Sequence, residues 1–219
     1  MEYDTMRAAA FVNITEKDII LYEDEGYWVL DKPFDIQIDG SRPCTLQGMI
    51  KRLRPDIDQI FFCHQLDYAT SGCILLAKHK FAAQKAQTMF AARMVHKEYW
   101  AWVRGEPKAQ SISAPILEQR YRCVVDEKGK EAHTDVEPME VQTWKGERIT
   151  LLRLFPHTGR RHQLRVHLAH IGHRIVGDVT YGDSPNLSRM MLHAQRLILA
   201  EPVHIDVNSP CPFLDATLF

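Results

Sequence analysis

The chain has 219 residues, of which 45% are hydrophobic and 25% charged, and its formal net charge is −1. This composition is ordinary for a globular protein and excludes an intrinsically disordered chain. A charge balance near zero also argues against a protein that wraps nucleic acid with a uniformly basic surface. A chain of this length suits one domain, or one core divided into two lobes.

The N-terminal residues, the apolar runs and the cysteines indicate the compartment. Residues 1–13 lack a basic region and have too short an apolar stretch for a signal peptide. No run of about 20 apolar residues exists, as a hydrophobic membrane helix would require. We therefore expect a monomeric cytoplasmic protein without a membrane partner, with nucleus and mitochondrion as alternatives. Thiols in a reducing compartment, with no disulfide framework, are expected for the five cysteines, which form no CxxC pair: Cys44, Cys63, Cys73, Cys123 and Cys211.

Apolar periodicity in the first half of the chain predicts a hairpin, two helices and a strand. Residues 19–22 and 27–30 are strand-like runs around an acidic, glycine-containing turn. Residues 45–53 place their apolar side chains on one face of a helix. Residues 80–94, rich in Ala, Gln, Lys and Met, predict a second helix. Alternation over residues 96–105 predicts the strand.

The second half of the chain continues with shorter signals. Residues 126–130 (DEKGK) are typical of a hairpin tip. Residues 149–155 predict a strand, residues 162–171 a helix with one buried stripe, and residues 196–199 a last strand. Trp100 and Trp102 share one face of their strand and are expected in the core. The tail is expected to follow the surface without chemistry, since it contains Pro202, Pro210 and Pro212.

Residues 61–78, FFCHQLDYATSGCILLAK, stand out because two apolar runs flank a short polar insert. Such runs predict buried strands, and Thr70, Ser71 and Gly72 have turn chemistry. Asp67 is then a carboxylate on a loop that two core strands hold in place. Taken by itself, the pattern fits an Asp that hydrogen-bonds its own turn better than a catalytic Asp.

The same stretch resembles the HRLDxxTSGLLLLAK signature of the pseudouridine synthases related to the bacterial enzyme RluA. Here it reads His64-Gln65-Leu66-Asp67, then Thr70-Ser71-Gly72, then Leu75-Leu76-Ala77-Lys78. The resemblance implies that Asp67 is the catalytic residue and that His64, Gln65 and Thr70 lie beside the substrate. Gln65 departs from the family, which has Arg at this position. In relatives that Arg helps to displace the flipped base, so base flipping is expected to be weaker here or differently assisted.

Two other segments resemble strand motifs of the same family. Lys32-Pro33 matches the family's opening, while Asp35 replaces a usual Gly and allows a different backbone conformation after Pro33. Lys97, Tyr99, Ala101, Val103 and Gly105 match a strand whose Tyr packs against the target base. Tyr99 is therefore implied as the aromatic residue of the site, although by itself it fits a half-buried strand tyrosine.

Residues 157–182 are similar to the family's second signature, TGRTHQIRVHLA followed by GD and YG. In the family the Arg of HQIR pairs with the catalytic Asp, and Arg165 occupies that place. A buried carboxylate that must stay ionised needs such a counter-charge. Arg160 and Arg161 are expected near the substrate; Arg161 replaces a Thr and offers either a phosphate contact or, as we favour, a solvated charge. Leu164 and Leu192 are implied as pocket walls, and His193, in an RxxLHA-like run, as a structural histidine.

The resemblance covers residues 19–199 and implies one catalytic domain over residues 1–219, with no separate RNA-binding domain. The implied fold is α+β, a bent and mainly antiparallel central sheet flanked by helices. The implied reaction converts uridine to pseudouridine in RNA (tRNA, rRNA or mRNA), with the target base flipped out of its stack. It needs no cofactor and no metal, because a carboxylate supplies the nucleophile or base. RNA phosphates are expected at residues 151–177, which contain five arginines and no acidic residue.

Three alternatives remain beside this interpretation. Residues 157–173 contain five histidines: His157, His162, His167, His170 and His173. A metal site is disfavoured there because the segment has no carboxylate and because its histidines do not converge on one point. Glycoside hydrolysis is disfavoured because no second acid pairs with Asp67. A non-catalytic RNA-binding protein with the same fold is the main alternative, supported by Gln65 and Asp35.

Overall fold

The computed structural model describes residues 13–40, 44–183 and 187–214. The chain divides into two compact units, of which the first takes residues up to 95 and 197–209, and the second takes residues 96–196 and those from 210 onward. Among the described residues, no helix has the length and apolar character needed to cross a bilayer. None of the five cysteines, all of which lie among the described residues, forms a disulfide, and Cys73 and Cys123 are buried.

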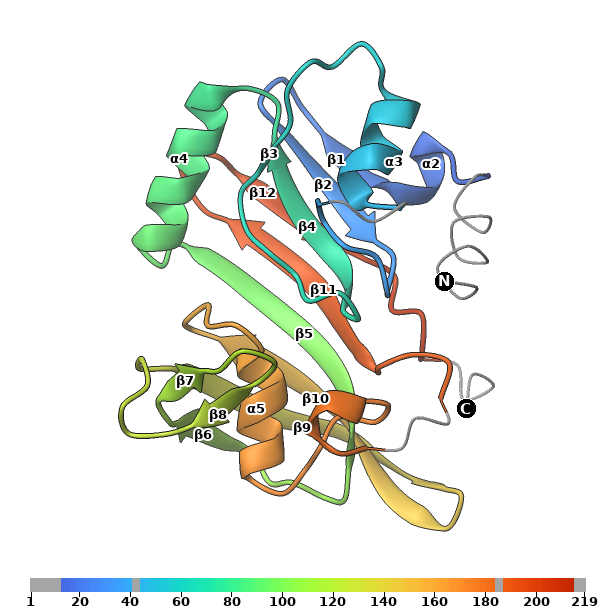
Figure 1. Ribbon diagram of the computed structural model, residues 1–219, viewed down its shortest axis with the longest axis vertical. Coiled ribbons are helices and arrows are strands. Elements are labelled where there is room, and N and C mark those ends of the chain that lie inside the picture. The colour runs from blue at the N-terminus through green and yellow to red at the C-terminus, as the bar shows by residue number, and fades with distance from the viewer. Residues whose placement is uncertain (1–12, 41–43, 184–186, 215–219) are drawn as a thin grey trace. The chain divides into compact units, whose positions relative to one another are not determined.

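The first unit is built on antiparallel strands, with β2 between β1 and β4 and with β3 also pairing with β4 (Figure 1). Its elements are α2 (Glu16–Ile19), β1 (Ile20–Glu23), β2 (Tyr27–Lys32), α3 (Leu46–Leu53), β3 (Phe61–Phe62), β4 (Ser71–Ala77), α4 (Lys80–Ala91) and β12 (Ile205–Asn208).

The helices and strands of this unit follow the sequence closely. Every residue of β4 is buried, as expected for an apolar run inside a layered core. The strand begins at Ser71, however, so the predicted turn residues Ser71 and Gly72 already pair with β2. Thr45 caps α3 by accepting a hydrogen bond from the Gly48 amide. Helix α4 ends at Ala91, earlier than predicted, because Arg93 turns the chain with φ of 58°.

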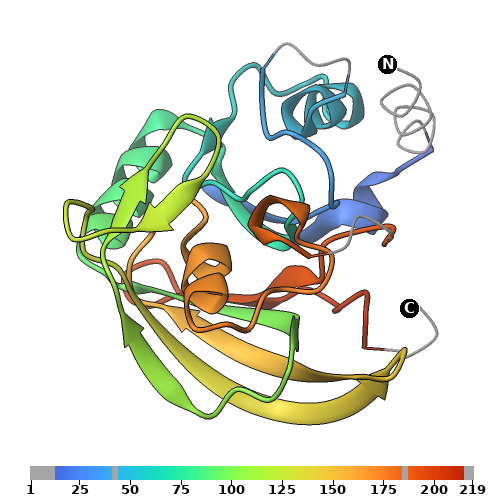
Figure 2. The same cartoon turned by 60° about the horizontal axis from the view of Figure 1, so that its bottom comes forward.

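The second unit contains a larger antiparallel sheet with the order β11-β5-β10-β9-β6, and a separate hairpin of β7 and β8. Helix α5 lies over one face of this sheet (Figure 2). The elements are β5 (Val95–Arg104), β6 (Gln110–Ser113), β7 (Ile116–Glu118), β8 (Cys123–Val125), β9 (His133–Trp144), β10 (Glu147–Pro156), α5 (Gln163–His170), η1 (Val179–Tyr181) and β11 (Leu192–Leu199).

The core of the second unit includes Trp102, which is 1% exposed, as predicted. Trp100 is only partly buried, and its indole Nε1 donates to Glu98. Phe213 is fully buried against Trp102, and its carbonyl accepts a hydrogen bond from the Trp102 indole. The prediction that the tail only follows the surface is therefore wrong, because the tail contributes Phe213 and strand β12 to the two cores.

Three further predictions need correction. Strand β11 begins at Leu192 rather than at residue 196, so His193 lies within it. Helix α5 buries every residue from Gln163 to Leu168, so it has no single buried stripe. The tip of the β7–β8 hairpin lies at residues 119–122, where the Gln119 amide bonds the Arg122 carbonyl, while residues 126–130 form the turn that follows β8. The α+β class with mostly antiparallel strands and few flanking helices is confirmed.

Candidate active site

Asp67 lies, half-buried, on the short loop between β3 and β4. Its carbonyl accepts a hydrogen bond from the Thr70 amide at 3.1 Å, which closes a turn. Leu66 before it is 8% exposed and Thr70 after it is 2% exposed, so buried side chains anchor the loop on both sides. A loop fixed in this way presents a carboxylate with little freedom of position.

Lys32, the last residue of β2, holds the same loop through its buried side chain. Its side chain is fully buried, and its ammonium group donates to the carbonyls of Pro33, Ile36 and Tyr68. Burying an ammonium group costs free energy unless its three protons are hydrogen-bonded, and these three carbonyls accept them. Lys32 therefore holds the backbone next to Asp67 and leaves a positive charge under the loop. The sequence signal for this role was the Lys32-Pro33 match, to which no function was assigned.

Asp35, in the turn after β2, adopts the left-handed conformation with φ of 52°. Glycine favours this region, and Asp is among the few other residues that enter it readily. Asp35 therefore holds a conformation that glycine would also adopt, and a difference from the family's backbone after Pro33 stays a prediction.

His64 and Gln65 differ in how they are held. The Nε2 atom of His64 accepts a hydrogen bond from the Leu75 amide at 2.9 Å, and its ring lies 5.2 Å from that of Phe90. These contacts anchor the loop to β4 and α4. Gln65 is exposed. Substrate roles for His64, Gln65 and Thr70 stay predictions.

Tyr99 lies in the middle of β5, opposite Leu154 of β10, and is 8% exposed. Two positions before it, Lys97 is half-buried, and burial lowers the pKa of its ammonium group. The strand alternation was therefore predicted correctly, while contact of Tyr99 with a base stays a prediction.

Arg165 forms a buried ion pair with Asp178. Its Nε lies 2.7 Å from Asp178 Oδ2 and its Nη2 lies 2.8 Å from Oδ1, and the two side chains are 7% and 1% exposed. Such a two-point pairing fixes the guanidinium plane. Arg165 also lies over the Tyr181 ring at 5.3 Å. Asp178 and Tyr181 belong to the GD and YG parts of the second signature. The fixed spacing of these parts after Arg165 was the sequence signal that could have identified them as its partners. The predicted pairing of Arg165 with Asp67 stays a prediction.

Gln163 and His167 hold α5 against β9. The Gln163 amide donates to the His133 carbonyl and to Thr134 Oγ1, and its Oε1 accepts from Thr158 and the Arg160 amide. His167 Nε2 donates to the Ala114 carbonyl, so its Nδ1 accepts from Thr134. Burial lowers the pKa of His167 and keeps it neutral. No sequence motif had predicted this role for Gln163 or His167.

The arginines of residues 151–177 fall into two groups. Arg153 is paired with Glu98 and Glu137, and Arg165 with Asp178. The others donate to backbone carbonyls: Arg160 to Glu131, Arg161 to Gln119 and Arg174 to Gly182. Arg161 is exposed and precedes α5, so it does not lie on the helix that carries Arg165.

Leu164 and Leu192 are 6% and 3% exposed, so both are core residues, and their roles as pocket walls stay predictions. His193 is fully buried, with its ring 6.2 Å from that of Phe213 in an edge-on arrangement. This burial agrees with the structural role that we favoured.

Comparison with known proteins gives consistent matches over most of the chain. A sequence profile of the family described as RNA pseudouridylate synthase matches residues 26–170. The RNA pseudouridylate synthase domain-containing protein 1 of Danio rerio is 36% identical over 96% of this chain and 80% of its own length. The dual-specificity RNA pseudouridine synthase RluA of Vibrio vulnificus is 36% identical over 89% of this chain and 83% of its own. A solved structure of the human domain-containing protein 1 has a TM-score of 0.82 at 34% identity, covering 90% of this chain and 85% of its own.

Proposed function

We propose that Asp67 starts the reaction of this chain, which belongs to the RNA pseudouridylate synthase family. Members of this family are isomerases that convert uridine to pseudouridine within RNA, and this is the activity of the chain. The observation that supports Asp67 is its place on a loop held by buried residues on both sides and by Lys32 below. No other residue of the first signature combines an acidic side chain with this support.

The chemistry requires an ionised carboxylate at the ribose. The N1–C1′ bond breaks, the uracil rotates, and C5 forms the new bond to C1′; C5 then loses its proton and N1 gains one. Asp67 begins this sequence either by attacking C1′ or by removing a proton from the ribose to form a glycal. Both routes need a nucleophile or base that supplies its own electrons, and neither needs a cofactor.

We assign Tyr99 and Arg165 supporting roles. Tyr99 stacks on the flipped uracil, since an aromatic face accepts any base orientation during the rotation. Arg165 supplies the positive charge that keeps the Asp67 carboxylate ionised. Its pairing with Asp178 supports this role, because the two-point contact fixes the plane of the guanidinium that supplies the charge.

We assign RNA binding in the second unit to the tip of the β7–β8 hairpin. At its tip Tyr121 is 76% exposed, with Arg120 over its ring at 5.1 Å, and Arg122, the next residue in the sequence, is also exposed. Arg161 holds this tip by donating to the Gln119 carbonyl. An exposed aromatic ring between arginines suits an unpaired base and its phosphates. Tyr121→Ala should weaken RNA binding without changing single-turnover chemistry at saturating RNA.

Pseudouridine mapping tests the proposed function. Cellular RNA is mapped with the protein present, absent, or replaced by the Asp67→Asn variant, which keeps the size of the side chain and removes its charge. We expect one or more uridines to lose modification in the second and third samples. Identical maps in all three would leave a non-catalytic RNA-binding protein as the correct interpretation. If modification is lost without the protein but is normal with the Asp67→Asn variant, the role of Asp67 is refuted while the synthase activity of the protein stands.

A further inference from the structure

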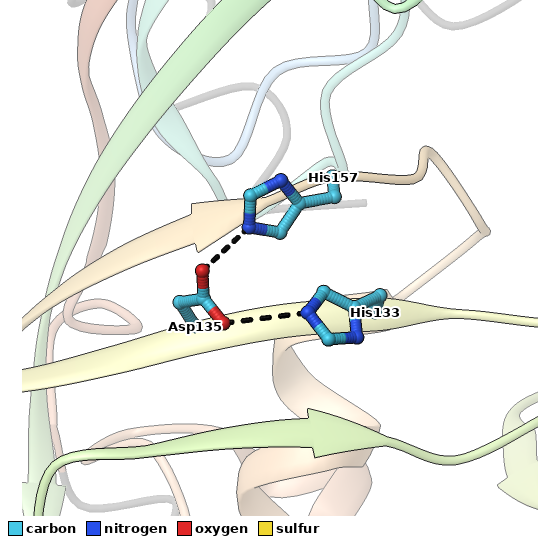
Figure 3. A group of neighbouring side chains, drawn as sticks. All are labelled: His133, Asp135 and His157. Carbon is cyan, nitrogen blue, oxygen red and sulfur yellow. Dashed lines mark hydrogen bonds and ion pairs between the residues drawn. The ribbon is translucent and has the colours of Figure 1, made fainter.

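Three side chains of the second unit gather on the outer face of β9. His133 and Asp135 alternate along this strand and so point to the same side, while the residue between them, Thr134, is buried under α5. His157 follows the last residue of β10, and its amide bonds the His133 carbonyl across the ladder. In Figure 3 both imidazole rings face the Asp135 carboxylate.

The distances within this group suit a cation. His157 Nε2 lies 2.6 Å from Asp135 Oδ2, and His133 Nε2 lies 3.4 Å from Oδ1. One ligand atom from each residue lies within 4.8 Å of the other two. Ligands around a tetrahedral zinc ion at bond lengths near 2.1 Å are separated by about 3.4 Å. The His133–Asp135 pair already has this separation, whereas the His157–Asp135 pair is closer, so metal binding requires the exposed His157 ring to move away from the carboxylate.

Two serines support the group from the neighbouring strand. Ser113 and Ser111 of β6 pair in register with His133 and Asp135. Ser113 Oγ lies 2.6 Å from His133 Nδ1, and Ser111 donates to Asp135 Oδ1. When His133 Nδ1 carries its proton toward Ser113, its Nε2 lone pair points at the carboxylate. In that tautomer a metal ion between the two groups would satisfy both lone pairs, as a second proton on the ring would, and hydrogen-bonded supports of this kind are typical around metal ligands.

We propose that His133, Asp135 and His157 bind one divalent transition-metal ion, with Zn²⁺ as the best match. Imidazole nitrogens favour this class of ion over Mg²⁺ and Ca²⁺. Three protein ligands leave a fourth position for water, which the partial exposure of the group permits. Of the five histidines weighed in the sequence, His157 is the one that joins this group. The other two ligands lie more than 20 residues earlier, and only the β9–β10 register brings them together.

Metal titration tests the proposal. Chelator-treated protein is titrated calorimetrically with Zn²⁺, and with Co²⁺ while its visible absorption is followed. We expect one saturable site with a nitrogen- and oxygen-ligated Co²⁺ spectrum. His157→Gln and Asp135→Asn should each weaken Zn²⁺ binding by about 100-fold or more, since even loss of a supporting residue costs about 10–100-fold. His170→Gln, an exposed histidine of α5 outside the group, should bind as the unchanged protein does.

Four results would overturn the site. The first is the absence of saturable Zn²⁺ binding by the wild-type protein. The second is undiminished affinity in either His157→Gln or Asp135→Asn. The third is a Co²⁺ spectrum with thiolate charge-transfer bands, which would assign the ion to cysteines. The fourth is an equal loss of affinity in His170→Gln. Both substituted ligands are at least partly exposed, so circular dichroism should show folded variants.

Discussion

The two charged residues of the proposed chemistry are held in opposite ways. Asp67 lies half-buried on a loop whose support comes from backbone hydrogen bonds and from the neighbouring Leu66, Thr70 and Lys32. Arg165 lies in a buried helix, and its guanidinium is held in place by its own ion pair with Asp178. Removing the Asp67 charge should therefore affect chemistry much more than folding, whereas removing the Arg165 charge should affect chemistry and folding together.

The largest expected effect is on turnover by Asp67→Asn. The single-turnover rate of uridine isomerisation should fall by about 10⁴-fold or more, as expected when the attacking group itself is lost. The free energy of unfolding should fall by less than in the Arg165 variant below, because Asn keeps the size of the side chain and Arg165 keeps its buried pair with Asp178. Rate and urea unfolding are measured on the same preparation. A stability loss as large as that of the Arg165 variant below would contradict the comparison.

Arg165→Met should abolish turnover and also destabilise the protein by about 3–5 kcal/mol, because it leaves the Asp178 carboxylate buried and unpaired. RNA affinity, measured where the variant is folded, should stay nearly unchanged. The control is Arg165→Met with Asp178→Asn, which removes the unpaired charge. This double variant should recover much of the stability in urea unfolding and none of the activity. A large loss of RNA affinity with normal single-turnover chemistry would instead make Arg165 a phosphate contact.

Tyr99 provides a smaller test of the proposed stacking. Tyr99→Leu should lower kcat/KM by about 5- to 160-fold, which corresponds to the roughly 1–3 kcal/mol usual for one base–aromatic stack. Tyr99→Phe keeps the ring and should retain most of the activity. Equal rates for the Leu and Phe variants would show that the ring does not contact the base.

Gln65→Arg sharpens the comparison in the opposite direction, because it adds a charge to the exposed side of the Asp67 loop. Restoring the family's residue should raise the rate of base flipping by up to about tenfold, while unfolding should change by less than about 0.5 kcal/mol for an exposed site. Fluorescence of a base analogue beside the target uridine reports the flipping. Gln65→Lys tests charge without the planar guanidinium. A decrease in rate with Arg would show that Gln65 is adapted to its own substrate.

Local sequence signals predicted elements better than partners. Strands β2, β4, β5 and β10 were predictable because apolar runs and alternation are local properties. The Arg165–Asp178 pair, which joins residues 13 positions apart, depends on the turn after α5. The burial of Phe213 depends on tertiary packing against Trp102, which no proline pattern reveals. The resemblance supplied candidate site residues, yet it could not say which buried groups hold them in place.

The smallest expected effect is the pH dependence of α5 docking through His167. Burial lowers the pKa of this imidazole below its ordinary value of 6.5, so the unfolded chain binds a proton more readily than the folded one. Its contribution to stability is complete above about pH 6.5 and declines as the pH falls toward the folded pKa. Carboxylates with lowered pKa values, such as Glu23 at about 2 beside Lys78, lose their contribution only at lower pH. The midpoint of thermal unfolding should therefore fall between pH 7 and 5.5 more steeply in the unchanged protein than in His167→Gln. His170→Gln, at the exposed end of the same helix, should keep the steeper slope; equal slopes in all three proteins would mean that His167 is not the group that titrates.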